Sequence, residues 1–200
     1  MIEKIVTGTF FTNTYIISNH GKCVIVDPGL DFKEAAEELK RQYEVVAILL
    51  THGHIDHIDG IRYFDCPIYI HEKELDFLTD STLSLYHMMN RQIPFSKADY
   101  HWILVRDEME FDLIGYHFKV LHTPGHTKGS VVYAYGNKLF SGDTLFYLSA
   151  GRTDFPTGSS KDLKHSLQKI IQIFPDSTEV YPGHDQKTTI QFERKHNPYL

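Results

Sequence analysis

Three histidines and two aspartates follow directly after the most apolar run of the sequence. They lie in the stretch THGHIDHIDG at positions 51–60, which comes after the run at residues 45–50. Imidazole and carboxylate groups are preferred ligands of borderline divalent metals such as zinc. A strand that ends here would give these side chains a rigid base from which to converge. The stretch therefore predicts one half of a metal site.

The spacing within this stretch separates the ligands into two groups. If the chain is still extended at His52, then His52 and His54 project to the same side, because side chains alternate along a strand. These two histidines can share one metal. Gly53 frees the backbone to turn, so Asp56 and His57 can point toward a second centre nearby. The stretch can therefore serve two metals.

Three later residues supply the other half of the predicted site. His126, Asp143 and His184 each follow a glycine and an expected strand. Glycine lets the backbone turn sharply and lets a metal approach without interference from a Cβ atom. His122 lies four residues before His126 and could be the ligand in its place. We assign the ligand role to His126, because His122 ends the run at 118–121 and is expected to pack or to support the site.

The motif His-x-His-x-Asp-His at 52–57 resembles the signature of the metallo-β-lactamase-fold hydrolases. The segments TPGHT at 123–127, SGDT at 141–144 and YPGH at 181–184 resemble the remaining motifs of that family, in the expected order. The resemblance covers residues 2–193 and is nearest to the short glyoxalase II-like members. It implies one metal on His52, His54 and His126, a second on Asp56, His57 and His184, and Asp143 as the bridging ligand.

Elements that can position these residues are expected along the whole chain. An antiparallel meander is predicted at 4–10, 14–18 and 22–27, followed by a helix that Asp31 caps together with Glu34. Further strands are predicted at 45–50, 67–71, 109–113, 117–122, 131–135, 138–140 and 179–181. Helices are predicted after Asp56, after a cap at Ser159 or Ser160, and at 186–195.

Residues 1–200 are expected to form a single domain of the α+β class. For the family that the motifs resemble, this is the four-layer αβ/βα sandwich, in which two mixed sheets pack face to face with helices outside.

Three features have more than one interpretation. Asp27 either supports the metals from beneath or simply begins a turn. Arg152 and Asp154 are expected to brace their loop as an ion pair rather than to contact substrate. Residues 72–105 contain apolar side chains at 83–89, which either extend over the site as a lid or pack on the domain.

Composition limits the classes of partner. With 20 Lys and Arg against 26 Asp and Glu, the net charge of −6 argues against a nucleic-acid surface. The sequence has no apolar stretch long enough for a membrane helix, and its start lacks the features of a signal peptide. Two cysteines, Cys23 and Cys66, fit a reducing compartment. We therefore expect a cytoplasmic protein; the sequence does not determine its oligomeric state.

The resemblance implies a metal-dependent hydrolase that acts on a small-molecule acyl substrate. Two divalent metal ions, with zinc expected and iron or manganese compatible, would share a hydroxide that attacks an acyl ester-type bond. Asp56 and Asp143 would hold the metals and orient the hydroxide. A thioester is the favoured substrate, because a thiolate with a pKa near 8.5 leaves with little help from a general acid. The resemblance implies a thioester such as a hydroxyacyl-glutathione, the substrate of a hydroxyacylglutathione hydrolase. Glyoxalase II proper binds the glutathione moiety through a further C-terminal helical region with basic residues, which would begin about where this sequence stops, so another acyl thioester is an equally open expectation.

Other functions are compatible with the same residues. A mononuclear iron persulfide dioxygenase uses this fold with a subset of the ligands, and bound iron with thiol-dependent oxygen uptake would identify it. A lactone hydrolase is a second alternative. A non-catalytic binding module stabilised by metal is a third, and it would have a closed coordination shell, as structural zinc sites do. A nuclease or phosphodiesterase is disfavoured by the acidic balance.

Overall fold

The first half of the chain forms a six-stranded sheet whose strands follow the sequence order. The computed structural model describes all residues from 1 to 200. The strands are β1 (Ile2–Thr7), β2 (Thr12–Asn19), β3 (Lys22–Val26), β4 (Glu44–Leu49), β5 (Ile68–His71) and β6 (Trp102–Val105). The first three strands are antiparallel, and β3 to β6 run parallel to one another.

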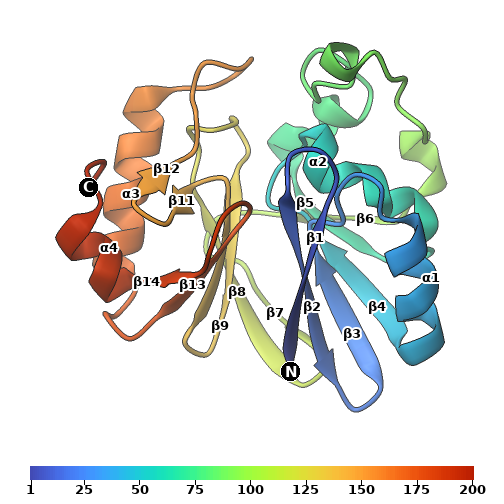
Figure 1. Cartoon of the computed structure of the whole chain (residues 1–200), viewed down its shortest axis with the longest axis horizontal. Coiled ribbons are helices and arrows are strands. Elements are labelled where there is room, and N and C mark those ends of the chain that lie inside the picture. The colour runs from blue at the N-terminus through green and yellow to red at the C-terminus, as the bar shows by residue number, and fades with distance from the viewer.

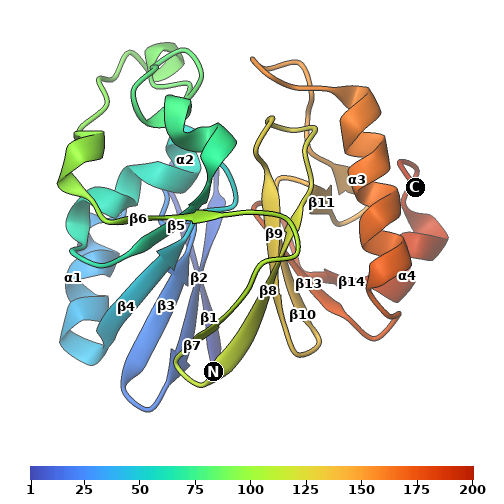
Figure 2. The same ribbon diagram turned by 180° about the vertical axis from the view of Figure 1, so that it is seen from behind.

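The second half forms another six-stranded sheet, in the order β14-β13-β10-β9-β8-β7. Its strands are β7 (Glu110–Leu113), β8 (Tyr116–His122), β9 (Val131–Tyr135), β10 (Lys138–Gly142), β13 (Glu179–Pro182) and β14 (Thr188–Thr189). A small hairpin of β11 (Leu145–Phe146) and β12 (Ser149–Ala150) follows β10. Figure 2 shows the chain crossing from the first sheet to the second between β6 and β7.

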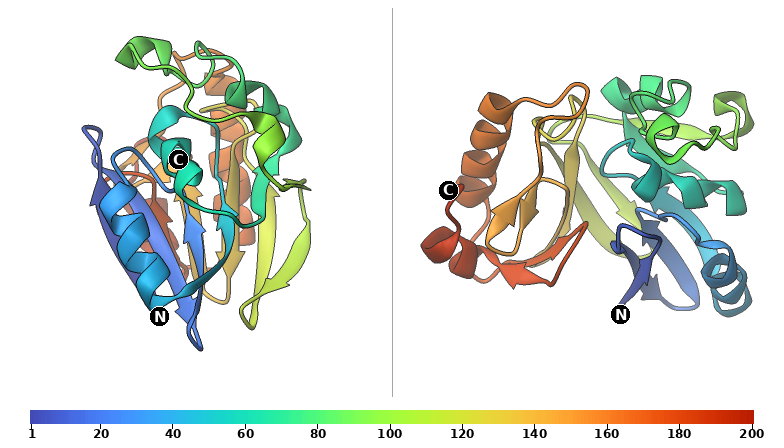
Figure 3. Two further views of the ribbon diagram at one scale, coloured as in Figure 1. Left: turned by 90° about the vertical axis from the view of Figure 1, so that its right-hand side faces the viewer. Right: turned by 45° about the horizontal axis from the view of Figure 1, so that its top comes forward.

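Helices cover the outer faces of both sheets. Figures 1 and 3 show α1 (Lys33–Gln42) outside the first sheet, and α3 (Ser160–Ile173) and α4 (Ile190–His196) outside the second. A short helix, α2 (Ile55–Ile58), lies at the upper end of the sheets in Figure 1. Four 3₁₀ segments complete the chain: η1 (Asp59–Tyr63), η2 (Glu72–Leu78), η3 (His87–Met89) and η4 (Lys97–Asp99). No helix is both long and apolar enough to cross a bilayer.

Three separate apolar clusters fill the three spaces between these four layers. Strand β2 shows why: Tyr15 and Ile17 face the second sheet, whereas Ile16, between them, faces the helical side. Strand β9 behaves in the same way, since Tyr133 joins the cluster between the sheets and Val132 packs under α3. Central strands are thus apolar on both faces, as a sheet covered on both sides requires. The predicted α+β four-layer sandwich is confirmed.

Some local predictions were wrong. The first strand ends at Thr7 rather than at residue 10, because Gly8 has a φ of +68° and begins the turn that leads to β2. Asp31 does not cap the first helix: Phe32 is the N-cap residue, without a side-chain bond, and Asp31 itself has a φ of +57°. The closing helix begins at Ile190 instead of 186, after β14, which the sequence did not predict.

Candidate metal centre

All seven predicted site residues meet at one end of the two sheets. The first sheet contributes the residues that follow β4, and the second contributes the residues that follow β8, β10 and β13. Three overlapping triples each place one potential ligand atom per residue within 4.8 Å of the others. These triples are His52, His54 and His126; His52, His57 and Asp143; and Asp56, His57 and His184. Two of them are the ligand sets expected from the sequence.

The segment after β4 turns at once into the short helix α2. His54 is the N-cap residue and still has extended backbone angles, whereas Asp56 and His57 lie within the helix. The sequence analysis predicted a helix only after Asp56, so the helix, which begins at Ile55, starts two residues earlier than predicted. The helical turn brings Asp56 and His57 to His184, while the His57 ring stays beside that of His52, with centroids 4.1 Å apart. Two neighbouring groups of ligands therefore arise from one short stretch.

Asp143 lies between the two groups. Its Oδ2 atom is 3.4 Å from Nε2 of His126 and 3.5 Å from Nε2 of His184, and its Oδ1 atom is 3.4 Å from Nε2 of His57. The preceding residue, Gly142, has a φ of +47°, and an added Cβ would lie 2.3 Å from the hydroxyl oxygen of Thr51. A residue with a side chain cannot occupy this position, so the glycine lets Asp143 reach the centre.

The donors of this cluster fit divalent cations. Nε2 of His52, Nε2 of His57 and Oδ1 of Asp143 are buried and have no hydrogen-bond partner. Buried polar atoms are ordinarily paired, so several unpaired ones in a single cluster require an explanation such as an ion. Imidazole and carboxylate donors in groups of three suit zinc, iron or manganese.

Burial keeps the first triple neutral in the metal-free protein. It lowers the pKa of His52 well below its usual value, lowers that of His54 to about 3, and also lowers that of His126. Neighbouring imidazoles add to the effect, because a second positive charge nearby is unfavourable. Nδ1 of His54 lies 2.9 Å from Nε2 of His126. This triple can therefore bind a cation without first losing protons.

The second triple is charged in the metal-free protein. Burial alone would lower the pKa of His57 and His184, but the carboxylates around them outweigh it and raise the values to about 9 and about 11. Asp143 contributes most to both increases. The same pairing lowers the pKa of Asp56 to about 2 against the effect of burial. Two imidazolium groups thus balance two carboxylates, and a cation must displace two protons here.

The stability of the metal-free protein should therefore fall as the pH rises. The pKa values of His57 and His184 in the folded state exceed the ordinary value of 6.5, so their stabilisation is complete below that pH and is lost between it and about 9 to 11. Bound metal replaces the protons, so the metal-loaded protein should not show this loss. Melting temperatures between about pH 6.5 and 9.5, with chelator and with zinc, measure the difference. A metal-free melting temperature that rises over this range would contradict the protonation described here.

Asp27 supports the centre from beneath, which decides between its two interpretations. Its Oδ1 atom accepts a hydrogen bond from the Thr51 amide at 2.8 Å. Its Oδ2 atom accepts one from the Thr51 hydroxyl at 2.6 Å and lies 3.0 Å from Nδ1 of His57. A carboxylate in this position orients the ring and directs the other nitrogen toward the metal.

Other supports were not visible in the sequence. The Thr12 hydroxyl donates to Oδ2 of Asp56 at 3.0 Å. Nδ1 of His126 lies 2.7 Å from the Arg152 carbonyl oxygen, and Nδ1 of His184 lies 3.1 Å from the Phe10 carbonyl oxygen. Backbone carbonyls carry no sequence signal, so these contacts depend on the fold alone.

His122 lies outside the cluster, as predicted. Its ring stacks on that of His71, with centroids 4.3 Å apart, and its Nε2 atom lies 3.1 Å from the Lys128 carbonyl oxygen. Neither histidine belongs to any of the three triples.

The cluster opens into a pocket of about 490 Å³. Five of the seven predicted residues line it, and half of its sixteen lining residues are apolar, including Phe10, Leu85, Met88, Met89, Phe146 and Phe155. Residues 85, 88 and 89 belong to the segment for which a lid and simple packing were both open. Leu85 and Tyr86 are buried in the domain, whereas Met88 is 60% exposed at the pocket. The segment therefore packs on the domain and also forms one wall of the pocket.

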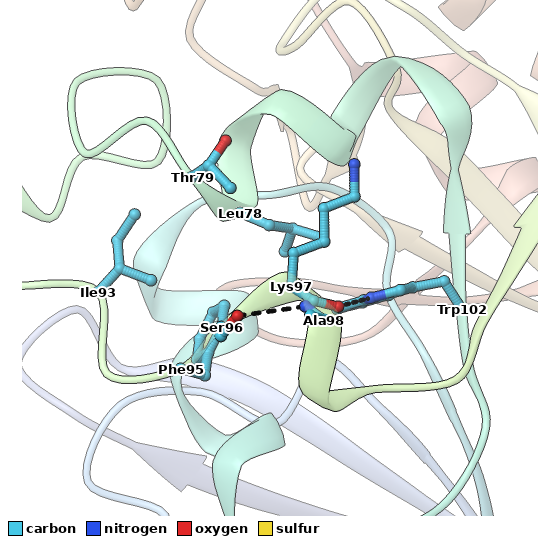
Figure 4. Close-up of a pocket in the computed structure, with 8 residues that line it drawn as sticks. All are labelled: Leu78, Thr79, Ile93, Phe95, Ser96, Lys97, Ala98 and Trp102. Carbon is cyan, nitrogen blue, oxygen red and sulfur yellow. Dashed lines mark hydrogen bonds between the residues drawn. The ribbon is translucent and has the colours of Figure 1, made fainter.

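A larger cavity, of about 750 Å³, lies away from the metal cluster. Figure 4 shows it between the end of η2 and the segment 93–102, with Phe95 and Trp102 among its lining residues. None of the seven site residues lines it, and its only charged lining group is Lys97. We therefore identify the smaller pocket as the functional one.

Arg152 forms the predicted ion pair with Asp154, through two contacts of 2.6 Å. Its guanidinium also lies 3.9 Å from the centroid of the Phe155 ring. Arg152 nevertheless lines the pocket, so the bracing role and a position at the substrate are compatible.

Comparisons with known proteins agree with this geometry. The profile of the metallo-beta-lactamase superfamily matches residues 7–184, a range that contains all seven clustered side chains. The probable metallo-hydrolase YqgX of Bacillus subtilis is 32% identical over 206 residues, which cover 99% of this chain and 96% of that protein. The crystal structure of the BLEG-1 B3 metallo-beta-lactamase has a TM-score of 0.91 and 40% identity, covering 100% of this chain and 99% of its own. The structure of TTHA1623 in a di-iron-bound form has a TM-score of 0.84 and 30% identity, covering 99% of this chain and 100% of that chain.

Proposed function

The chain belongs to the metallo-beta-lactamase superfamily, and from this premise we propose that it is a binuclear metal-dependent hydrolase of small acyl compounds, with thioesters as its preferred substrates. The proposal rests on one observation: two groups of three potential metal ligands lie on either side of Asp143, at the base of a pocket in which half of the lining residues are apolar. A purely structural metal site would be closed, whereas this one faces a space large enough for a substrate.

The two cations would be held by the residues already described. His52, His54 and His126 would hold one, Asp56, His57 and His184 the other, and Asp143 would contact both. Such a pair supplies hydroxide at neutral pH and polarises an acyl carbonyl. Imidazole and carboxylate donors suit zinc and iron alike, and TTHA1623 was crystallised in a di-iron-bound form.

The protein's own residues fix where the acyl group can lie. Asp143 and Asp56 present carboxylate oxygens at the base of the pocket, where they can accept a hydrogen bond from an attacking oxygen and orient it. Phe10, Met88 and Phe155 line the walls and exclude water from the acyl chain.

The pocket favours a leaving group that needs no proton. Apart from the metal cluster, the titratable groups that line it are Arg152 and Asp185. A guanidinium does not give up its proton at neutral pH, and Asp185 is exposed to solvent. A thiolate leaves without protonation, because its pKa is near 8.5. This supports a thioester over an amide.

Hydrolysis of a β-lactam is the second candidate, because the BLEG-1 B3 metallo-beta-lactamase is 40% identical to this chain along its whole length. The strained amide of a β-lactam leaves as an amine nitrogen that must take up a proton. Outside the metal cluster, the pocket offers only the Arg152 guanidinium and the exposed Asp185 near this nitrogen, so we place this activity below thioester hydrolysis.

A substrate panel tests the proposal. Zinc-loaded and iron-loaded protein would be assayed with short-chain and medium-chain acyl thioesters, a γ-lactone, a penicillin and a phosphodiester. We expect the highest kcat/KM for a thioester with an apolar acyl group. A higher kcat/KM for the lactone or the penicillin would change the assigned substrate but would still identify the protein as a hydrolase. Oxygen uptake with a persulfide and iron, or no turnover of any compound by fully metallated protein, would overturn the proposal.

A further inference from the structure

A buried carboxylate outside the metal cluster links two of the segments that supply its ligands. Glu74 lies in η2 and is fully buried. Its Oε2 atom accepts a hydrogen bond from the Gly53 amide at 2.7 Å. Its Oε1 atom accepts bonds from the Thr127 hydroxyl at 2.8 Å and from the Gly129 amide at 2.7 Å. Gly53 separates His52 from His54, and Thr127 directly follows His126.

We propose that Glu74 is a positioning residue that holds the segments of His54 and His126 at the separation a cation needs, and so sets the metal affinity of the triple His52, His54 and His126. The proposal rests on the metal centre of the proposed function. The added residue, Glu74, would itself contact neither the metal nor the substrate.

The three contacts match the acceptor capacity of an ionised carboxylate. All three partners donate, so a group with four acceptor lone pairs and no donor matches them. Burial raises the pKa of Glu74 to about 7, while the hydrogen bonds from Thr127, Gly53 and Gly129 act against this increase. A buried carboxylate is costly unless it is hydrogen-bonded in this way, so its presence here indicates a specific role.

The surrounding backbone is shaped to let the carboxylate approach. A Cβ added at Gly129 would lie 2.6 Å from Oε1 of Glu74. A Cβ added at Gly53 would lie 3.0 Å from Oε2 of Glu74 and 2.5 Å from Cβ of Phe77. At Gly129 the added atom would collide with the carboxylate itself, whereas at Gly53 it would collide with Phe77 and crowd the carboxylate. The two glycines therefore allow the same carboxylate to reach both segments.

Glu74 acts on one triple and not on the other. Nδ1 of His54 and Nε2 of His126 are 2.9 Å apart, and Glu74 bonds to a residue adjacent to each of them. The other triple has separate supports: Thr12 on Asp56, Asp27 on His57 and the Phe10 carbonyl on His184. Loss of Glu74 should therefore weaken one metal site selectively, which a general loss of stability would not do.

The variant Glu74→Gln tests this selectivity. Glutamine has nearly the same shape, but its amide NH₂ group must face at least one of the three donors. The matched control is Glu72→Gln, because Glu72 is exposed on the same 3₁₀ segment. Each change would be made in a His184→Ala background, which leaves the three-histidine triple, and in a His54→Ala background, which leaves the other triple. Cobalt(II) affinity would be measured by competitive titration against a chromogenic chelator.

We expect Glu74→Gln to weaken cobalt binding about 10- to 100-fold in the His184→Ala background and less than about twofold in the His54→Ala background. Glu72→Gln should change neither. Equal weakening in both backgrounds, or no weakening in either, would overturn the proposal. Absence of cobalt binding by the unmodified protein would instead refute the proposed metal centre, before any variant is compared.

A second variant keeps the test valid if Glu74→Gln does not fold. Thr127→Val removes one donor to Oε1 and leaves the carboxylate in place. It should weaken the same site by a smaller factor. Where both single variants fold, the double variant should show less than the product of the two effects, because both act through one carboxylate. An effect of Thr127→Val on the other triple would contradict the proposal.

Discussion

Replacement of Asp143 by asparagine is expected to lower hydrolysis by at least about a thousandfold, because in the proposed centre this carboxylate would hold both of the cations that supply hydroxide at neutral pH. Asp143 approaches His57, His126 and His184 at 3.4 to 3.5 Å, so it contacts both ligand groups. Asparagine keeps the shape but has no charge and offers one acceptor oxygen. Bound metal should fall below two ions per chain together with kcat, as elemental analysis of the purified variant would show.

The control for this variant is Asp112→Asn, an identical chemical change on the exposed strand β7. It should leave both metal content and kcat unchanged. An Asp143→Asn protein that keeps two metals per chain and full turnover would contradict the bridging position that we assign to this residue.

Alanine at Gly183 should also reduce activity severely, at least about a hundredfold, although it retains all seven ligands. An added Cβ at this position would lie 2.3 Å from Oδ1 of Asp143 and 2.8 Å from Cε1 of His57. Contacts this short must displace one or both ligands, and a misplacement of this kind far outweighs the small size of the change. The measurement is metal affinity by titration, together with kcat at saturating metal.

Gly21→Ala separates this effect from a loss of stability. Gly21 has a φ of +74°, and nothing lies within 4 Å of an added Cβ. The substitution therefore costs about 1 to 2 kcal/mol in backbone strain and leaves the centre untouched. If Gly183→Ala lowers metal affinity no more than Gly21→Ala does, then Gly183 is not needed for the close approach of Asp143 and His57.

The residues that meet at the site could be predicted because their signal is local. Four of the residues lie within the six positions 52–57: His52, His54, Asp56 and His57. The other three each follow a glycine near the end of a strand. Parallel strands bring such ends to the same edge of a sheet. The structure brings all seven side chains together, six of them in the two expected triples and Asp143 between them. Their roles as ligands are the proposal that the variants above test.

The supporting residues could not be predicted, because their partners are remote in the sequence. Glu74 lies in a charged stretch of the sequence, and its three hydrogen-bond partners are 21, 53 and 55 residues away. Asp27 was left undecided for the same reason, since its contact with His57 spans 30 residues. Strand β6 was missed because its parallel pairing with β5, rather than any periodicity of its own, defines it.

The local errors have local causes. The apolar residue Phe10 extended the first predicted strand, but it is exposed in the turn and lines the pocket. Asp31 precedes Glu34 with capping-box spacing, yet its positive φ places it outside the geometry of an N-cap. In both cases the backbone conformation that the fold imposes differs from the one that the residue types alone favour.

The most direct test of the central claim is a metal titration of chelator-treated protein, followed at each step by hydrolysis of an acyl thioester. The account predicts no hydrolysis without metal, a rise in activity as metal is added, and a plateau at two equivalents per chain. Full turnover by metal-free protein, or a plateau with no metal bound to the seven-residue cluster, would contradict it.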